Sequence, residues 1–300
     1  MDSNQRLISE RILTVDSVED INALFIDRGW SDGLPIIPPT EEAVEKMLTG
    51  THRDPADAVG VIPPLWSEAT VEKIAINAVM AGCLPEYMPV LIAAVSAMCE
   101  EPLNLRGVQA TTHPVSILLI VNGPITKRLN INGKSGAFGP GWRSNACIGR
   151  AIRLILMNIG GAYREKTDMA TQGQSAKYTF CIAENEEENP WEPLHVERGF
   201  NRIADTVTVA AVENPHNIND HCGITGEEVL TTIAGTIATT GNNNVLKQYG
   251  EPILALGPEH AETIFQSGFS KISIKEFVYE KARIPIGRFN KGAIKRYFSN

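Results

Sequence analysis

Runs of apolar residues along the chain divide into short segments with the length and composition of β-strands. The two clearest are residues 115–121 and 206–212, which are rich in aliphatic and β-branched side chains. Three shorter candidates lie beside proline, glycine or clustered polar residues, at 58–62, 178–183 and 252–256. We expect these five segments to be the strands of the protein.

Elsewhere, apolar residues recur every three or four positions, which is the spacing of one face of an α-helix. Serine or threonine stands at the start of several of these segments, where its hydroxyl can cap the first turn. The predicted helices are Ser17–Arg28, Thr40–Leu48, Ser67–Gly82, Met88–Cys99, Arg143–Asn158, Thr225–Thr239, Glu259–Ser267 and Ser273–Arg283. The alternation predicts an α/β layered fold, with a mostly parallel or mixed sheet and helices on both faces.

The N-terminal part of the chain differs from the rest. Residues 1–57 combine two predicted helices with a segment, 29–40, that holds three prolines and two glycines and excludes regular structure. We expect residues 1–57 to be a helical, proline-rich cover and residues 58–300 to be the α/β core. A proline follows three of the predicted strands within a few residues, which is compatible with a core of two similar halves.

Charge and composition exclude several classes of function. The 300 residues carry a net charge of −8, and the basic residues are scattered except in the last dozen or so, so nucleic-acid binding is not expected. No apolar run reaches the ~20 residues that cross a bilayer, and the N-terminus lacks a signal pattern. We expect a cytoplasmic protein without membrane contact. The proline-rich segment and low charge density suit a homo-oligomer.

Polar loops follow four of the predicted strands, after residues 121, 183, 212 and 256. If these strands are parallel, all four endings meet at the carboxyl edge of one sheet, where open α/β sheets bind ligands. This edge is therefore the expected place for a functional site.

The loop after residue 212 carries side chains suited to metal binding or proton transfer. His216, Asp220 and His221 lie within six residues, and Glu184 and Glu186 follow another predicted strand. Imidazole and carboxylate ligands suit Zn²⁺, Fe²⁺ or Mn²⁺, with His216, His221 and Glu186 as the expected ligands. Without a metal, one histidine would act as a general base oriented by Asp220, helped by Glu184. The alternative is a polar turn in which Asp220 caps the next helix.

A glycine-rich loop, residues 133–142, leads into the helix predicted from Arg143. Gly136, Gly139 and Gly141 allow the backbone to approach a ligand closely, and a helix N-terminus offers unpaired N–H groups. Arg143 adds a donor for a carboxylate or phosphate. The spacing matches neither a Walker A loop nor a dinucleotide fingerprint, so no nucleotide cofactor is expected. The alternative is a flexible surface loop.

Two further residues are candidates. His113 follows two threonines and precedes a strand, so it could line a substrate pocket, although at the opposite end of that strand from the expected edge. Cys181 lies close to the end of its predicted strand and is a candidate nucleophile. The five cysteines form no C-x-x-C pair, so most are expected to be free thiols that fill apolar space.

The chain resembles, over nearly its full length, an uncharacterised bacterial family found alongside or fused to domains with a U-G-S-C or C-G-S-C (seleno)cysteine motif. The residues that carry the resemblance are Trp30–Thr40, Glu68–Lys73, Gln109–Pro114, Phe138–Arg143, Phe180–Glu187 and His216–His221. The resemblance implies a partner protein that supplies the redox-active sulfur, because this chain has no Cys-Gly-Ser-Cys motif. That implication puts a self-contained thiol mechanism in doubt.

Two hypotheses for function follow. The first is an enzyme that acts on a small anionic molecule by hydrolytic or lyase-type chemistry, using a His/Asp/Glu metal or acid–base centre at strand ends. The second is a thiol-dependent redox component that works with a separate CGSC/UGSC partner. A catalytically silent subunit is a third alternative.

Overall fold

The computed structural model describes residues 7–14, 17–246 and 250–298. The chain divides into two compact units: unit 1 is Met1–Asn185 with Leu194–Asn214, and unit 2 is Glu186–Pro193 with Pro215–Asn300. Residues 1–57 therefore belong to the same unit as the central sheet, and the expected division after residue 57 is not the one that the contacts show. No helix among the described residues is both long and apolar enough to span a bilayer.

Unit 1 is built on a three-stranded sheet. Its strands are β3 (Ser116–Asn122), β4 (Cys181–Ala183) and β5 (Thr206–Val212), in the spatial order β4-β3-β5. β3 runs parallel to β4 and antiparallel to β5. The expected α/β fold with a mixed sheet is therefore confirmed.

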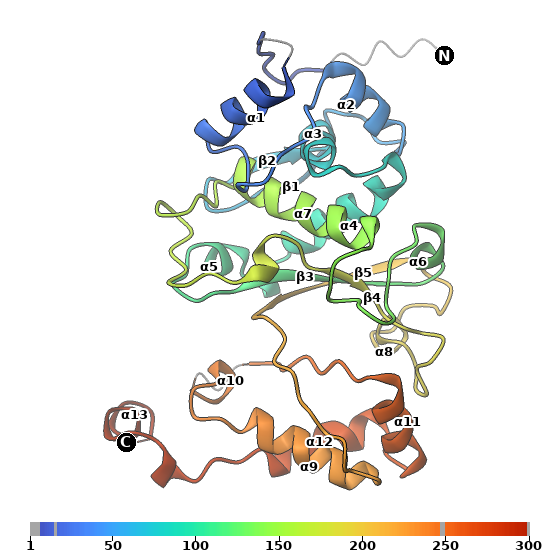
Figure 1. Ribbon diagram of the computed structural model, residues 1–300, viewed down its shortest axis with the longest axis vertical. Coiled ribbons are helices and arrows are strands. Elements are labelled where there is room, and N and C mark those ends of the chain that lie inside the picture. Colours follow the sequence, from blue (N-terminus) through green and yellow to red (C-terminus); the bar gives the residue numbers. More distant parts are fainter. Residues whose placement is uncertain (1–6, 15–16, 247–249, 299–300) are drawn as a thin grey trace. The chain divides into compact units, whose positions relative to one another are not determined.

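Helices lie on both faces of this sheet (Figure 1). α4 (Met88–Met98) and α7 (Arg143–Asn158) pack on one face, α3 (Val71–Ala81) packs on α7, and α2 (Glu41–Leu48) packs on α3. One apolar core runs through these layers. On the other face, the short α8 (Leu194–Glu197) contributes Leu194 to a smaller cluster with Leu118, Ile120 and Phe180.

The proline-rich segment 29–40 is tied to α7. Arg150 makes a two-pronged ion pair with Asp32, Nη2 to Oδ1 at 2.8 Å and Nε to Oδ2 at 2.9 Å, and also donates to the carbonyls of Leu34 and Pro35. The Asp32 side chain is only 3% exposed, so this pair is shielded from water. Asn158 donates from its amide to the carbonyl of Trp30 at 3.0 Å. A segment without regular structure is thus held on the surface of a helix by paired polar groups.

The remaining elements of unit 1 are α1 (Val18–Asp27), β1 (Ala58–Ile62), β2 (Ser67–Thr70), α5 (Leu105–Gln109), α6 (Ile125–Arg128) and the 3₁₀ turns Pro85–Tyr87, Glu101–Leu103 and Ser175–Lys177. The helix expected from Ser67 begins at Val71 instead. Ser67 pairs with Ile62 in the β1–β2 hairpin, and the Thr70 hydroxyl accepts from the Lys73 N–H as the helix cap. Either residue type can cap a helix, and strand pairing decides which one does.

Unit 2 is helical in its described residues, with no strand. Its helices are α9 (Gly226–Ile237), α10 (Asn243–Leu246), α11 (Pro258–Gln266), α12 (Lys271–Lys281) and α13 (Lys291–Tyr297), with a 3₁₀ turn at Ile286–Arg288. The strand expected at 252–256 is wrong. Leu254 and Leu256 pack against the apolar cluster of α9 and α11, centred on Leu230 and Ile264, without pairing to another strand. The two units are therefore not similar halves.

A tryptophan explains why residues 186–193 belong to unit 2. The Trp191 ring meets Phe265 edge-on, with centroids 6.0 Å apart, and its indole N–H donates to the carbonyl of Phe269 at 2.9 Å. A half-buried tryptophan with a satisfied N–H contributes both apolar area and a directional bond. Trp191 thus anchors residues 186–193 to unit 2.

The start of α9 offers a test of local stability. The Thr225 hydroxyl accepts from the Glu228 N–H, and the Glu228 carboxylate accepts from the Thr225 N–H, which is a capping box. We expect Thr225→Ala to lower the unfolding free energy of unit 2 by about 1 kcal/mol. Urea unfolding followed by the fluorescence of Trp191 measures it. Thr231→Ala on the exposed face of α9 is the matched control, and it should cause no loss. Equal effects of the two substitutions would contradict the capping role.

Candidate functional site

The direction of β5 separates loops that were expected to meet. Ser116 at the start of β3 pairs with Val212 at the end of β5, whereas Val121 near the end of β3 pairs with Ala183 at the end of β4. The ends of β3 and β4 thus share the carboxyl edge, and the end of β5 lies at the amino edge. The expected convergence of all strand endings is wrong, because β5 is antiparallel and residues 252–256 form no strand.

Glu184 lies at the carboxyl edge as expected. Its Oε2 accepts from the amide of the fully buried Asn122 at 2.6 Å and from the Leu194 N–H at 2.8 Å. These bonds join the end of β3 to the segment that returns from residue 194. Glu184 therefore positions two parts of unit 1 in the structure.

The glycine-rich loop starts at the same edge. The Asn145 side chain bonds both the N–H and the carbonyl of Asn132, at 2.8 and 2.9 Å, and that carbonyl also accepts from the Ala183 N–H. Gly133 lies so close to β4 that a Cβ there would be 2.5 Å from the Ala183 oxygen. Glycine is required at 133 for this close approach. The first turn of α7 is thereby fixed to the end of β4.

The rest of the loop is exposed and leads to an uncapped helix. Gly136 and Gly141 have φ of 74° and 114°, a region that favours glycine, and both lie on the surface. Trp142 occupies the cap position of α7 without a side-chain bond, and no acidic residue stands in the first turn. Gly139, also exposed, donates from its N–H to the Gly136 carbonyl at 2.8 Å. Positive charge thus accumulates at the start of the longest helix.

Arg143 uses part of its guanidinium within the protein. Its Nε and Nη2 donate to the Gly82 carbonyl at the end of α3, at 3.2 and 3.0 Å. A cation at a helix C-terminus is favourable, and the other guanidinium N–H groups lie on an exposed side chain. Arg143 is therefore fixed in place at the mouth of the glycine loop.

The Cys83 and Cys147 thiols lie beside Arg143, and the Cys181 thiol lies near that of Cys83. The Cys83 thiol contacts the Cys147 carbonyl at 3.3 Å. Burial raises the pKa of Cys83 well above its usual value and raises that of Cys181 to about 12. Burial also raises the pKa of the half-buried Cys147, although Arg143 opposes this shift. At neutral pH all three are thiols rather than thiolates, which favours the packing role for Cys181 over the nucleophilic one.

A cavity of about 310 Å³ opens at this edge, between the start of α4, α6 and the start of β5. Its lining is mostly apolar and includes Glu86, Arg128 and Asp205, of which Arg128 and Asp205 form an ion pair at 2.5 Å. Such a volume lies within the range of small-molecule sites, roughly 300–1,000 Å³.

The histidines expected to form a centre belong to unit 2. His216 and His221 are exposed. Thr232 and the backbone N–H groups of Gly223 and Cys222 donate to the carboxylate of Asp220 and lower its pKa to about 2. Asp220 thus organises a turn, but the residue that caps the next helix is Thr225 and not Asp220.

A different histidine, His260, contacts Asp220: its Nε2 lies 2.9 Å from the backbone carbonyl oxygen of Asp220. Glu186, the third expected metal ligand, also lies in unit 2. Among the described residues, no three His, Cys, Asp or Glu side chains lie close enough together to hold a metal ion.

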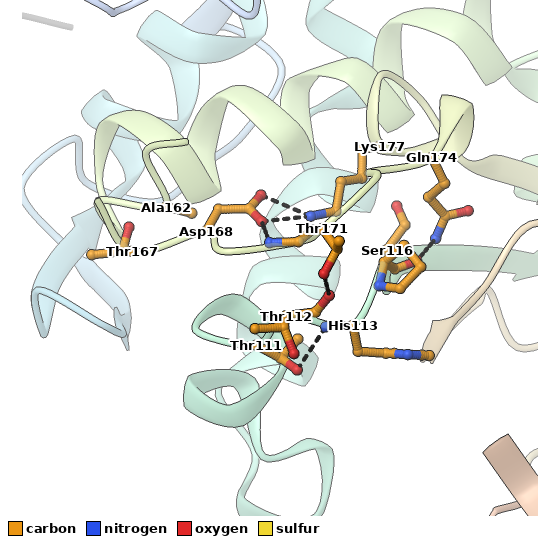
Figure 2. Close-up of polar contacts among 12 residues, drawn as sticks. Thr111, Thr112, His113, Ser116, Ala162, Thr167, Asp168, Thr171, Gln174 and Lys177 are labelled. Carbon is orange, nitrogen blue, oxygen red and sulfur yellow. Dashed lines mark hydrogen bonds and ion pairs between the residues drawn. The ribbon is translucent and has the colours of Figure 1, made fainter. Parts of the chain in front are cut away.

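The amino edge of the sheet holds His113 (Figure 2). Its Nε2 lies 3.1 Å from Oε1 of Glu213, which directly follows β5. The Thr111 hydroxyl accepts from the His113 N–H at 3.0 Å, and the Thr112 carbonyl accepts from the N–H and hydroxyl of Thr171. His113 is therefore paired with a carboxylate that only the antiparallel direction of β5 brings to it.

A mostly buried charge cluster that no sequence motif indicated lies near this edge (Figure 2). Lys177 Nζ lies 2.8 Å from both oxygens of Asp168, and Arg153 Nη2 lies 3.3 Å from Oδ2. Burial alone would raise the pKa of Asp168, but the bond and charge of Lys177, with Arg153, lower it below its usual value. The three residues are widely spaced along the chain, so no local pattern predicts their contact.

Comparison with known proteins adds no family. The chain matches no protein-family model, and no curated protein or solved structure is significantly similar to it. The resemblance to the family associated with U-G-S-C and C-G-S-C motifs therefore stays a prediction, and function has to be inferred from the geometry.

The buried cluster gives a second test. We expect Asp168→Asn to lower the unfolding free energy of unit 1 by about 3–5 kcal/mol, because two buried cations lose their counter-charge. Asp57→Asn, in an exposed pair with Arg53, is the control and should change it by about 0.5 kcal/mol or less. Urea unfolding measures both.

The same pair of variants gives a pH signature. The pKa of Asp168 is lowered by folding, so its contribution is present above the unfolded value of about 4 and is lost as pH falls through the folded value. The difference between wild type and Asp168→Asn should therefore shrink in acid. A difference that is constant with pH would contradict the charge pairing.

Proposed function

We propose that the protein is an enzyme acting on a small anionic molecule, and that unit 1 binds the anion where the glycine loop meets α7. The observation that carries the proposal is the start of α7, which has no side-chain cap, no acid in its first turn and Arg143 as its first residue. Unpaired N–H groups and the helix dipole favour an anion there. Exposed glycines on the approach leave the backbone accessible.

Two further features support a small-molecule site at this edge. Arg143 is held by the Gly82 carbonyl, so its guanidinium is already oriented before a ligand arrives. The cavity of about 310 Å³ at the carboxyl edge provides concave space for the body of a substrate. The anion we propose is a carboxylate or a phosphate, both of which pair with guanidinium groups.

The reaction we propose is hydrolytic or lyase-type. Acid–base groups can activate water or remove a proton without an organic cofactor.

Titration with inorganic phosphate and with succinate tests the anion site. Trp142 stands at the helix start, so its fluorescence should change on binding, and Trp142→Phe should remove that signal. We expect Arg143→Gln to weaken binding roughly 10- to 100-fold, the loss of one charge-assisted hydrogen bond.

Arg53→Gln is the matched control, since this arginine lies in an exposed ion pair away from the loop. It should bind both anions as wild type does. Equal binding by Arg143→Gln and wild type would refute the site, as would the absence of saturable binding in wild type.

One observation favours the second function, a thiol-dependent redox role. Cys83 and Cys147 come from different helical segments and meet beside Arg143, where a thiolate would gain a hydrogen bond. The Cys147 thiolate would attack a disulfide in the partner's Cys-Gly-Ser-Cys motif, forming a mixed disulfide and releasing the partner's other cysteine as a thiolate.

Alkylation separates the two functions. The raised pKa values of Cys83, Cys147 and Cys181 leave little thiolate at pH 7, so exposed Cys222 should react first with iodoacetamide. The rate at Cys147 should rise about tenfold per pH unit until its raised pKa is reached. Mass-spectrometric mapping measures the order. Fast modification of Cys147 at pH 7 would favour the redox role instead.

A further inference from the structure

The walls of the cavity at the carboxyl edge say what kind of molecule fits it. All of its lining residues belong to unit 1, and its volume of about 310 Å³ lies at the lower end of small-molecule sites, so it holds one small ligand. The cavity is partly open to solvent. Its apolar walls are Pro89, Val90 and Ala93 of α4, Ile125 of α6, Leu129 and Val207. A ligand that covers these walls has an apolar body.

The charged side chains of the lining leave one carboxylate without a partner. They are Glu86, Arg128 and Asp205, so the lining has a net charge of −1. Asp205 uses both of its carboxylate oxygens, since Oδ1 accepts from the Ile125 N–H at 2.7 Å and Oδ2 accepts from Nη2 of Arg128. Glu86 is exposed and forms no ion pair or hydrogen bond within the described part of the chain. The charge that a ligand meets in this cavity is therefore that of Glu86.

The positive charge of the proposed anion site lies close to the same segment. Burial raises the pKa of Tyr87, Arg143 opposes this rise, and the neighbouring Glu86 adds to it. One phenol is thus influenced by both charges. Arg143 itself donates to the Gly82 carbonyl rather than pairing with Glu86. An anchored cation and a carboxylate without a counter-ion therefore lie on either side of one short stretch of chain, residues 82–87.

We propose that the substrate is a zwitterion of the amino-acid type, whose apolar body fills the cavity and whose ammonium group pairs with Glu86. The inference rests on the proposed function, because its anionic group occupies the site at the start of α7 beside Arg143. An ammonium ion complements the carboxylate of Glu86, and an apolar stem complements the aliphatic walls. Because Glu86 is exposed, the ammonium group keeps part of its hydration and binds without the large unfavourable desolvation of a buried charge.

Calorimetric titration of the full chain with n-hexylamine and 1-hexanol tests the cavity without using the anion site. The two probes share an apolar chain and differ in charge. The amine should bind roughly 2- to 5-fold more tightly, which is the range of an exposed ion pair. Glu86→Gln should remove this preference, whereas Glu45→Gln, exposed on α2, should keep it. Equal binding of the two probes by wild type overturns the proposal.

A substitution that fills the cavity tests the apolar part. Ala93 is an exposed lining residue of α4, so Ala93→Phe places a ring in the cavity and should weaken hexylamine binding by about tenfold, the loss of roughly two buried methylene groups. Ser96→Phe, exposed on the same helix but outside the lining, is the matched control and should bind as wild type does. Urea unfolding checks that both variants fold. Unchanged binding by Ala93→Phe overturns the cavity as the site.

A series of ω-aminocarboxylates, from 4-aminobutanoate to 8-aminooctanoate, tests the combination of the two charges. At least one member should bind more tightly than hexylamine, and Glu86→Gln and Arg143→Gln should each weaken it. A loss with Arg143→Gln alone overturns the zwitterion and leaves the proposed anion site standing. Glu86-dependent binding of the amine by a protein that binds neither phosphate nor succinate overturns the proposed function and the zwitterion with it.

Discussion

The pairing of β3 on both sides is the constraint on which the rest of unit 1 depends. All seven residues of this strand are buried, and both of its edges are bonded, to β4 in parallel and to β5 in antiparallel direction. A strand buried in this way can exist only if every backbone donor and acceptor finds a partner. The two partners then decide which loops lie at which end of the sheet, and α7 has to cross from the end of β3 to the start of β4.

This arrangement gives the two edges of the sheet different chemistry. At the carboxyl edge, a helix starts without a cap behind an exposed glycine loop, beside an arginine that is already anchored. At the amino edge, the charges of Arg153, Asp168 and Lys177 are mostly buried and paired with one another. An exposed loop and an exposed arginine suit ligand exchange, whereas a mostly buried ion cluster suits a permanent structural role. The proposed functions of the two edges follow from that difference in exposure.

Sequence patterns predicted the helices well because their signals are local. The start of α7 at Arg143, the Thr40 cap of α2 and the Thr225 cap of α9 each depend on a few neighbouring residues. The failures have a different cause. Leu254 and Leu256 have the spacing of a strand, but apolar side chains can also pack on helices without any ladder bonds. The strand expected at 178–183 has only three residues in the structure. Its length is set by pairing with β3, not by the propensity of its residues.

By itself, the sequence determined the α/β class, most helix boundaries, the glycine loop before α7 and the presence of His113 before a strand. Only the tertiary structure decided that β5 runs antiparallel, which moved the end of that strand to the opposite edge and placed Glu213 beside His113. It also decided that Arg143 bonds the end of α3 and that Asp168 lies between Arg153 and Lys177. The physical reason is that caps and periodicity are properties of adjacent residues. Strand direction and buried ion pairs depend instead on long-range pairing and desolvation, which no short stretch of sequence encodes.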